Sequence, residues 1–294
     1  LHTAYRRQRQ MCIRDRSIFV CCHRPAPIKK SSVLVPIQVG SALGTEKLDM
    51  IGDSEGENIS GKNRFYCELT AQYWIWKNCR SNYVGLFHYR RFLNFKTKEK
   101  VFHTFGDNFA EKFGLTEAGV LALCRNYDVI LPRKCPKGVS LYENYNNEHI
   151  AADLDAAVEI IGEKYPAMAE TAEEVLRKSN EGYFMNILVT SKTFFDRYSA
   201  WLFDVLGELE RRIQDDVVRR SDYQKRVYGF VAERLMNVYI EFLRKTENIK
   251  IKELPLLFWE EDEKEWRKYK NKMLKRKILT ALGLGKKKWK VQDA

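Results

Sequence analysis

Two arginines beside a histidine and a tyrosine form the residue group with the clearest chemical potential. The run His88-Tyr89-Arg90-Arg91 directly follows the apolar stretch 83–87. Guanidinium groups present forked N–H donors that match the oxygens of phosphate. The run therefore suits a diphosphate. Pairing of one arginine with a structural carboxylate, while the other is solvated, explains the same residue types equally well.

Two further groups contain side chains that can accept or transfer a proton. Near the expected start of a helix stand Glu148, His149 and Asp153. Helix capping and a surface position explain them in isolation. On the expected helix 222–244 stand Arg226, Glu233 and Arg234, and Arg226 shares a face with Glu233 because they are seven residues apart. A buried structural ion network is the favoured interpretation of this second group.

Two weaker signals lie nearer the N-terminus. His23 and Arg24 follow the first expected strand, where a surface turn is the commoner explanation. The polar loop 43–63 contains acids and amides that can bind a ribose hydroxyl or a metal, or can simply be solvated, namely Asp53, Glu55, Glu57, Asn58 and Ser60. A loop of this length in a folded domain usually has a function.

Alternating strands and helices must position these residues. Hydrophobic patterning predicts strands at 17–22, 33–39, 83–87, 128–131, 184–190 and 249–254. It predicts helices at 63–78, 116–125, 150–164, 167–177, 192–213 and 222–244. This order indicates an α/β fold with a mixed, mostly parallel sheet flanked by helices and a helix-rich C-terminal half. Ligands of such sheets bind beyond the carboxyl ends of the strands, so we expect the site in the loops after residues 22, 39, 87 and 131.

The composition excludes several classes of protein. With 45% hydrophobic residues, 16 Gly and 7 Pro among 294 residues, the chain is neither disordered nor collagen-like. It has no uncharged apolar run long enough to span a membrane. It also has no glycine-rich phosphate loop, no nucleophile-elbow motif and no cysteine spacing typical of zinc. We expect the cysteines after residue 16 to be reduced thiols of a cytoplasmic protein.

The first sixteen residues resemble a translated sequencing adapter. Residues 6–16 match the reading of a common transposase-type adapter position by position, and a basic N-terminal arm is the alternative. Residues 1–16 hold five Arg and one Asp, a net charge of +4, whereas 264–294 hold twelve Lys or Arg and two acids, a net charge of +10. Because the whole chain carries +12, residues 17–263 are nearly neutral at −2. We therefore expect no basic face for duplex DNA.

Thirteen blocks in order resemble a bacterial capsular and exopolysaccharide family, formerly a domain of unknown function, whose characterised members are galactofuranosyltransferases. The most distinctive are Val-Pro-Ile-Gln-Val-Gly at 35–40, Tyr-Val-Gly-Leu-Phe-His-Tyr-Arg-Arg at 83–91 and Gly-Phe-Val-Ala-Glu-Arg-Leu at 229–235. The others lie at 19–25, 58–60, 62–63, 66–70, 73–74, 76–78, 130–132, 149–154, 186–188 and 201–203. The similarity covers about residues 17–259.

The resemblance implies a GT-A-like, Rossmann-like glycosyltransferase domain at 17–259. It would transfer a hexose, by precedent galactofuranose from UDP-galactofuranose, with inversion to a lipid-linked glycan in capsule, exopolysaccharide or O-antigen synthesis. The arginines at 90 and 91 occupy the place where GT-A enzymes usually carry a metal-binding Asp-x-Asp motif. We therefore expect no required cofactor, with Mn²⁺ or Mg²⁺ as the alternative.

The same resemblance implies roles for individual residues. We expect the donor to contact His23, Val39, Asn58, His88, Tyr89, Arg90 and Arg91. The block 149–154 makes Asp153 the first choice of general base, with Glu148 and His149 beside it and Glu233 in reserve. Acceptor contacts or structural support are expected from Asn186, Arg226, Glu233 and Arg234. The family often has Asn-Met-Phe where this chain has Asn-Ile-Leu at 186–188, which leaves the acceptor open.

The basic tail at 260–294 mixes Trp, Leu and Ile with lysines. Such a segment suits the anionic inner face of a cytoplasmic membrane, where a lipid-linked acceptor and other polysaccharide-assembly enzymes would be met. A solvated tail is equally compatible with this composition. A nucleic-acid-binding protein that uses the tail, and a catalytically silent scaffold, are the rival functions. We expect no nucleic-acid partner.

Overall fold

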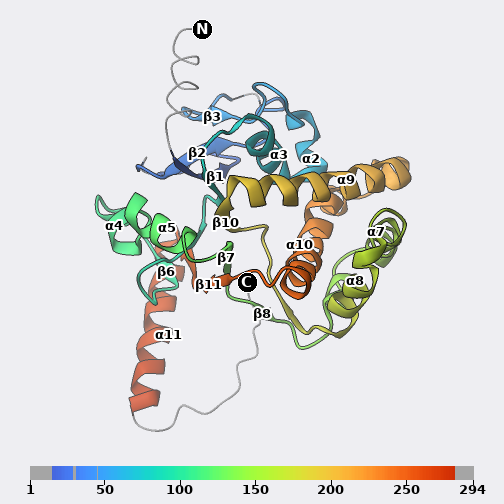
Figure 1. Cartoon of the computed structure of the whole chain (residues 1–294). Coiled ribbons are helices and arrows are strands. Elements are labelled where there is room, and N and C mark those ends of the chain that lie inside the picture. The colour runs from blue at the N-terminus through green and yellow to red at the C-terminus, as the bar shows by residue number, and fades with distance from the viewer. Residues whose placement is uncertain (1–14, 29–30, 45, 282–294) are drawn as a thin grey trace.

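A mixed β-sheet runs through the centre of the molecule, and helices cover both of its faces (Figure 1). The computed structural model describes residues 15–28, 31–44 and 46–281. Its strands are β1 Arg16–Cys22, β2 Leu34–Gln38, β3 Ile51–Gly52, β4 Tyr83–His88, β5 Arg91–Leu93, β6 Val101–Phe102, β7 Val129–Pro132, β8 Cys135–Pro136, β9 Glu181–Gly182, β10 Leu188–Ser191, β11 Ile251–Leu254 and β12 Leu256–Trp259. Its α-helices are α2 Asn63–Tyr66, α3 Leu69–Asn78, α4 Phe109–Phe113, α5 Glu117–Cys124, α6 Leu141–Asn146, α7 Ala151–Lys164, α8 Pro166–Lys178, α9 Lys192–Val217, α10 Val227–Thr246 and α11 Glu263–Ala281, with 3₁₀ turns at Ser60–Lys62 and Gln224–Arg226.

The strand order confirms the predicted α/β architecture. The main path of the sheet is β11-β7-β10-β4-β1-β2-β3, and within it β10 runs against the other strands. Strands β5, β6 and β12 extend the sheet from the end of β4. Strands β1, β2 and β4 are parallel neighbours, so their carboxyl ends meet at one edge, which is the edge predicted for the site.

Strand β1 is apolar from Ile18 to Cys22 because both of its faces are covered. Successive side chains of a strand point to opposite faces. Phe19 and Cys21 enter the core under α3, α9 and α10, whereas Ile18, Val20 and Cys22 enter a second core under α4, α5 and β12. Burial on both faces explains why the sequence reads as a continuous apolar run rather than an alternating one.

Two expected helices are interrupted, and both breaks occur beside the sheet edge. The segment expected as one helix at 63–78 is divided into α2 and α3 at Cys67, whose φ of 52° and ψ of −129° are incompatible with a helix. The helix expected from residue 222 starts as α10 at Val227, after the 3₁₀ turn Gln224–Arg226. Helical periodicity cannot reveal these breaks, because the apolar spacing continues across them.

The strand expected at 184–190 starts four residues later, at Leu188. The preceding residues Met185 and Asn186 have φ values of 73° and 50°. This left-handed conformation is unfavourable for residues other than glycine, at a cost of about 1–3 kcal/mol each. The chain therefore turns into β10 through a strained segment.

A buried aspartate organises the long loop after β2. The carboxylate of Asp53 accepts hydrogen bonds from the backbone N–H groups of Gly40 and Ser41, at 2.9 and 3.0 Å, and from the hydroxyl of Ser60. Both oxygens of the Asp53 carboxylate are therefore occupied by hydrogen bonds within the loop itself. Asn58 has a similar task, since its amide donates to the carbonyl oxygens of Ser54 and Gly56 at 2.9 and 2.8 Å.

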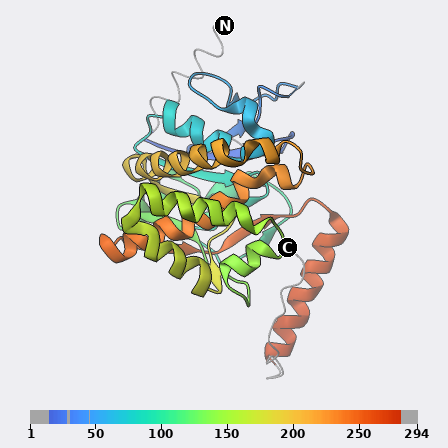
Figure 2. The ribbon, with the colours of Figure 1, turned by 90° about the vertical axis from the view of Figure 1, so that its right-hand side faces the viewer.

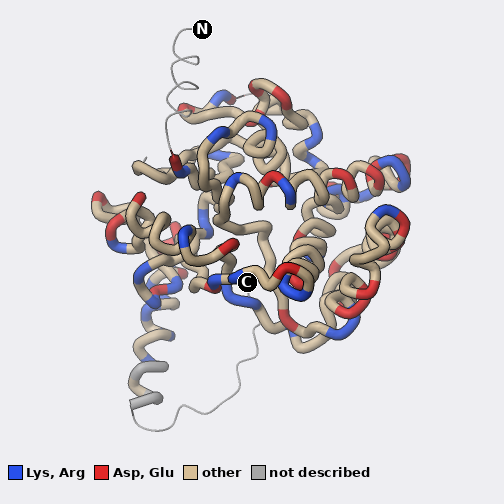
Figure 3. Tube along the Cα trace, in the orientation of Figure 1, with Lys and Arg blue, Asp and Glu red and all other residues tan. Residues whose placement is uncertain are grey.

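The C-terminal helix α11 projects from the body (Figure 2), and Lys and Arg recur along it (Figure 3). Its base is held by Trp266, whose indole stacks on His103 with ring centroids 5.4 Å apart. Farther along, Leu274 and Ile278 are 58% and 50% exposed.

None of the helices in the described residues has the length and apolar character to cross a membrane. Residues 282–294 of the tail and 1–14 of the expected adapter segment lie outside the described residues, and β1 begins at Arg16.

A buried ion pair joins α7 to the segment after α9. Both carboxylate oxygens of Asp153 accept hydrogen bonds from the guanidinium of Arg220, at 2.7 and 2.8 Å. The side chain of Asp153 is 3% exposed and that of Arg220 is 9% exposed, and Arg220 also pairs with Asp216. Such bidentate pairs are rigid, and removal of one partner leaves a buried charge.

We expect Asp153→Asn to lower stability strongly, because Arg220 would keep its charge and lose its bidentate partner. We expect the free energy of unfolding to fall by about 2–4 kcal/mol. This is less than the roughly 3–5 kcal/mol typical when one partner of an isolated buried ion pair is removed, because Asp216 still pairs with Arg220. Thermal and denaturant unfolding measure it. The control is Asp155→Asn on the same helix, whose exposed carboxylate pairs with Arg177. Equal stability of both variants and the parent would contradict a structural role for Asp153.

Candidate functional site

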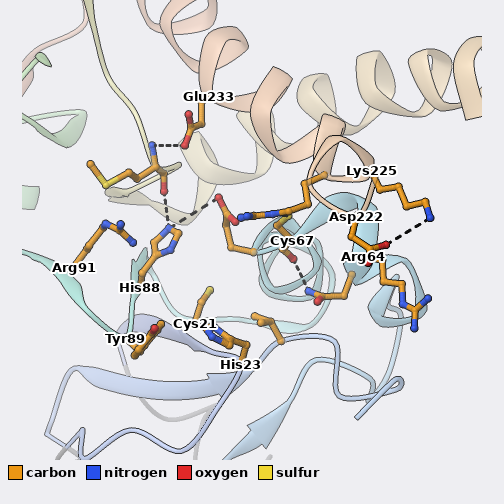
Figure 4. A pocket seen from close by; sticks show the side chains of 15 residues that line it. Cys21, His23, Arg64, Cys67, His88, Tyr89, Arg91, Asp222, Lys225 and Glu233 are labelled. Atoms are coloured by element: carbon orange, nitrogen blue, oxygen red, sulfur yellow. Dashed lines mark hydrogen bonds and ion pairs between the residues drawn. The ribbon is translucent and has the colours of Figure 1, made fainter. Parts of the chain in front are cut away.

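A cavity of about 750 Å³ opens at the carboxyl ends of β1, β2 and β4 (Figure 4). Its other walls come from the α2–α3 junction, the segment before β10 and the start of α10. This volume lies within the range of small-molecule sites. The residues that line it are Cys21, His23, Val39, Asn63, Arg64, Cys67, Glu68, His88, Tyr89, Arg91, Met185, Asp222, Lys225, Arg226 and Glu233.

The cavity contains four permanent cations and three carboxylates. The cations are Arg64, Arg91, Lys225 and Arg226, and the acids are Glu68, Asp222 and Glu233. Figure 4 shows His88, Arg91 and Glu233 towards one end, with Arg64, Asp222 and Lys225 towards the other. Asp222 pairs with Lys225 at 3.6 Å, and the other charges of the lining are the guanidinium groups of Arg64, Arg91 and Arg226 and the carboxylates of Glu68 and Glu233.

Arg91 is a cation with unused hydrogen-bonding capacity. Its guanidinium lies 4.8 Å from the ring centroid of Phe258, and its Nε is buried without a hydrogen-bond partner among the described residues. Burial and the neighbouring Arg90 lower the pKa of Arg91, which is the expected response of a desolvated cation beside another. The guanidinium nevertheless lines the cavity, where its positive charge suits an anionic ligand.

His88 links β4 to the segment that enters β10. Its Nε2 lies 2.6 Å from the carbonyl oxygen of Met185, and because a carbonyl oxygen only accepts, Nε2 carries the hydrogen. Burial lowers the pKa of His88, and the charges of Arg91 and Arg226 act in the same direction against Glu68. The ring of His88 is therefore uncharged at neutral pH.

His23 and Tyr89 line the neighbouring wall. Their rings meet edge to face with centroids 4.9 Å apart, at the ends of β1 and β4. Burial, followed by the charge of Arg24, lowers the pKa of His23. With Val39 they form a surface that is mostly uncharged.

Two glutamates face the cavity in different surroundings. Glu233 accepts a hydrogen bond from the backbone N–H of Met185 at 2.9 Å and pairs with Arg234 at 2.9 Å. Burial raises the pKa of Glu233 in spite of these contacts. Glu68 accepts from the amide of Asn186 at 2.8 Å and lies 4.0 Å from Nε2 of His88. Both carboxylates are therefore held against the left-handed segment at 185–186.

The structure brings together seven of the residues predicted for the site and places two more directly behind them. Those at the cavity are His23, Val39, His88, Tyr89, Arg91, Arg226 and Glu233. Asn186 supports Glu68 through the hydrogen bond given above, and Arg234 supports Glu233 and Asn144. Asn186 and Arg234 are 1% and 3% exposed, which fits their role as support.

Three of the remaining predicted residues are engaged elsewhere. The guanidinium of Arg90 points away from the cavity, to the carbonyl oxygen of Trp259 at 3.3 Å and to Glu260 at 3.4 Å. It therefore does not join Arg91 in a phosphate clamp. Asn58 holds its own loop, and Asp153 is committed to Arg220.

Glu148 and His149 also lie outside the cavity lining. Glu148 is exposed at the end of the turn after α6, and its carbonyl oxygen accepts a hydrogen bond from Gln224 at 3.0 Å. The ring of His149 stacks on Phe230 with centroids 4.0 Å apart. None of the three residues of the block 148–153 that were expected to act in catalysis thus lies in the lining of the cavity.

Sequence reasoning missed Glu68, Arg64 and Met185. Glu68 belongs to the block 66–70, which carried part of the family resemblance, but the continuous helical pattern gave no reason to single it out. Met185 acts through its backbone, which side-chain chemistry cannot reveal. Among residues 15–28, 31–44 and 46–281, no three His, Cys, Asp or Glu side chains gather closely enough to hold a metal ion.

The model of a family described as Domain of unknown function (DUF4422) matches residues 17–245. Comparison with curated proteins gives no match. Among solved structures, the apo structure of WbbM, a bifunctional glycosyltransferase, is similar, with a TM-score of 0.79 and 33% sequence identity. The similarity covers 83% of this chain and 45% of the WbbM chain, so this chain corresponds to less than half of that protein. The central sheet and its flanking helices thus have a glycosyltransferase fold, and the chain belongs to the DUF4422 family.

Proposed function

We propose that the chain is a glycosyltransferase that transfers a hexose from a UDP-sugar to a glycan acceptor with inversion at the anomeric carbon. Galactofuranose is the donor sugar that the family resemblance favours, and a lipid-linked glycan of a capsule, exopolysaccharide or O-antigen is the acceptor. The observation that carries the proposal is the pair of guanidinium groups, of Arg91 and Arg226, that lines a cavity at the carboxyl edge of the sheet. The similarity to WbbM supports the reaction class.

The diphosphate of the donor fits between Arg91 and Arg226. Both guanidinium groups depress the pKa of His88, so both lie near that ring from different elements, Arg91 on β5 and Arg226 on the 3₁₀ turn before α10. Two fixed cations neutralise the charge that develops on the leaving diphosphate. The pair is therefore Arg91 with Arg226, rather than the adjacent arginines 90 and 91. His23, Val39 and Tyr89 offer the less charged wall for the nucleoside.

Glu233 is the general base of the proposed reaction. The acceptor oxygen attacks the anomeric carbon while the bond from that carbon to the diphosphate oxygen breaks, and the electron pair leaves with the UDP. The acceptor proton passes to the carboxylate of Glu233. A raised pKa makes that carboxylate a better proton acceptor than an ordinary surface glutamate. Glu68, held by Asn186, is the rival base.

The C-terminal helix is proposed to rest on an anionic membrane surface. Leu274 and Ile278 expose apolar side chains among lysines on α11. Insertion of such residues at the headgroup level, together with attraction of the lysines to anionic lipids, is typical of peripheral binding. This would bring the cavity to a lipid-linked acceptor.

Removal of the cavity arginine is expected to abolish most of the activity. Arg91→Ala should lower kcat/KM for the UDP-sugar by roughly 10²–10³-fold, because one fixed charge on the leaving group is lost. The matched control is Arg90→Ala, which removes a neighbouring guanidinium that binds Glu260 instead. A radiolabelled-sugar transfer assay measures both variants, with thermal-shift titration of UDP and UDP-sugars as the binding readout. Equal losses in the two variants would contradict the placement of the diphosphate.

The same assay tests the role of the arginines in place of a metal. We expect activity to survive EDTA, because guanidinium groups supply the positive charge. Activity that is lost in EDTA and restored by Mn²⁺ would mean that a divalent cation holds the diphosphate.

Replacement of the proposed base should affect turnover more than donor binding. Glu233→Gln is expected to reduce kcat by about 10²–10⁴-fold while UDP still stabilises the protein. Because the base must be unprotonated, parental activity should rise with pH through an apparent pKa above the ordinary glutamate value. The control is Glu241→Gln on the same helix, which loses only a contact with Arg244. Loss of turnover in Glu68→Gln, with normal turnover in Glu233→Gln, would assign the base to Glu68.

Vesicle flotation tests the membrane proposal. The double variant Leu274→Glu and Ile278→Glu should float several-fold less than the parent with vesicles rich in phosphatidylglycerol, since both apolar contacts are lost. Leu43→Glu is the matched control, because Leu43 is 50% exposed on a loop of the body far from α11 in the sequence. Flotation that is unchanged in the double variant would exclude α11 as the binding element.

A further inference from the structure

A stack of aromatic rings adjoins the cavity at the start of α10. Tyr223 is 50% exposed and lies in the same short segment as the cavity residues Asp222, Lys225 and Arg226. Its ring centroid is 5.1 Å from that of Phe230 and 5.8 Å from that of His149. Tyr223 therefore presents an aromatic surface beside the cavity.

The rings behind Tyr223 are fixed by their own packing. His149 lies nearly parallel to Phe230, with an interplanar angle of 21° and centroids 4.0 Å apart, and it contacts the buried Tyr145 at 4.8 Å. Burial, followed by the charge of Arg234, lowers the pKa of His149 to about 4, so the imidazole is an uncharged aromatic ring at neutral pH. The platform Tyr223–Phe230–His149 is thus rigid on its inner side and open on its outer side.

Arg226 connects the platform to the cavity. Its guanidinium lines the cavity and lies 5.2 Å from the ring centroid of Phe230. Its Nε also donates to the sulfur of Cys67 at 3.1 Å, which fixes the side chain between α10 and the α2–α3 junction. A molecule on the platform is therefore adjacent to the place proposed for the diphosphate.

Further exposed apolar side chains lie on the connections next to the platform. Ile150 follows His149 and is 38% exposed, and Val218 precedes the Tyr223 segment and is 47% exposed. The Asp153–Arg220 ion pair ties these two connections together. Hydrogen-bonding groups surround them, since the side chain of Asp222 is 99% exposed and Glu148 is exposed as well.

We infer that the platform Tyr223–Phe230–His149 binds a sugar ring of the acceptor glycan. A sugar has one apolar C–H face and a rim of hydroxyl groups. The aromatic rings suit the C–H face, and the carboxylates of Asp222 and Glu148 suit the hydroxyls. Tyr223 lies in the same short segment as the cavity residues Asp222, Lys225 and Arg226, so the end of a glycan bound to the platform reaches into the cavity. This inference rests on the proposed function and adds the position of the acceptor.

The test uses the full chain with soluble oligosaccharide probes. Disaccharides and trisaccharides of galactose, glucose, rhamnose and N-acetylglucosamine are screened by saturation-transfer NMR in the presence of UDP. At least one should receive saturation from aromatic protons. Tyr223→Ala should weaken its binding roughly ten-fold, the range expected for loss of one stacking partner. Tyr223→Phe keeps the ring and should bind like the parent.

Several outcomes would overturn the inference. One is binding of the oligosaccharide with equal affinity to the parent and to Tyr223→Ala. Another is binding of no oligosaccharide while UDP still raises the unfolding temperature, and in that case the proposed function survives. A third is that Tyr223→Ala weakens the binding of farnesyl phosphate but not that of any oligosaccharide. That result would assign the platform to the lipid portion of the acceptor. Failure of both UDP and the oligosaccharides to bind would instead count against the proposed function itself.

Discussion

One strand that runs against its neighbours determines the shape of the cavity. Because β10 is antiparallel to β4, the chain enters β10 at the edge where β4 ends. The segment 185–186 must therefore cross this edge beside His88, and it does so with two left-handed residues. Its exposed backbone groups are satisfied by cavity side chains, with the Met185 carbonyl bound to His88 and the Met185 N–H bound to Glu233. The reversal of a single strand thus positions a histidine and a glutamate that are 145 positions apart.

The same segment keeps the two glutamates of the cavity distinct. Glu233 is held by the backbone of Met185 and by Arg234, and Glu68 is held by the side chain of Asn186. Each carboxylate thus has its own donors, so in the proposed reaction one can act as a base while the other stays an acceptor of fixed hydrogen bonds. The strain at 185–186, of about 1–3 kcal/mol per residue, is the cost of this arrangement.

The sequence was sufficient to predict the edge of the sheet on which the site lies. The buried strands β1, β2 and β4 have continuous apolar runs, so their carboxyl ends and the residues that follow, His23, Val39 and His88, were identified from pattern alone. Arg226 and Glu233 were identified on the expected helix 222–244, and the family block 229–235 also contains Glu233. The position of Asp153 outside the cavity was not predictable, because its pairing with Arg220 is a tertiary contact across 67 residues.

The directions in which individual side chains point could not be predicted from the sequence either. Arg90 and Arg91 are adjacent and chemically identical, yet the turn between β4 and β5 sends the first to Glu260 and the second to the cavity. Arg90 lies in the turn and bonds to Trp259 and Glu260, whereas Arg91 is the first residue of β5, so the two adjacent side chains have different partners. The position of each arginine in the hairpin, rather than its residue type, decides which of the two is available to a ligand.

Arg226 is the point where the donor and acceptor halves of the proposed reaction meet. The 3₁₀ turn Gln224–Arg226 replaces the first turn of an otherwise continuous helix, and this places Arg226 over Phe230 while its Nε reaches Cys67. Since the guanidinium that we propose to face the diphosphate also adjoins the aromatic platform, an acceptor sugar on Tyr223 would partly exclude water from it. A guanidinium with less water around it attracts the leaving diphosphate more strongly. In the proposed reaction, the broken start of α10 would therefore let acceptor binding strengthen the stabilisation of the departing UDP.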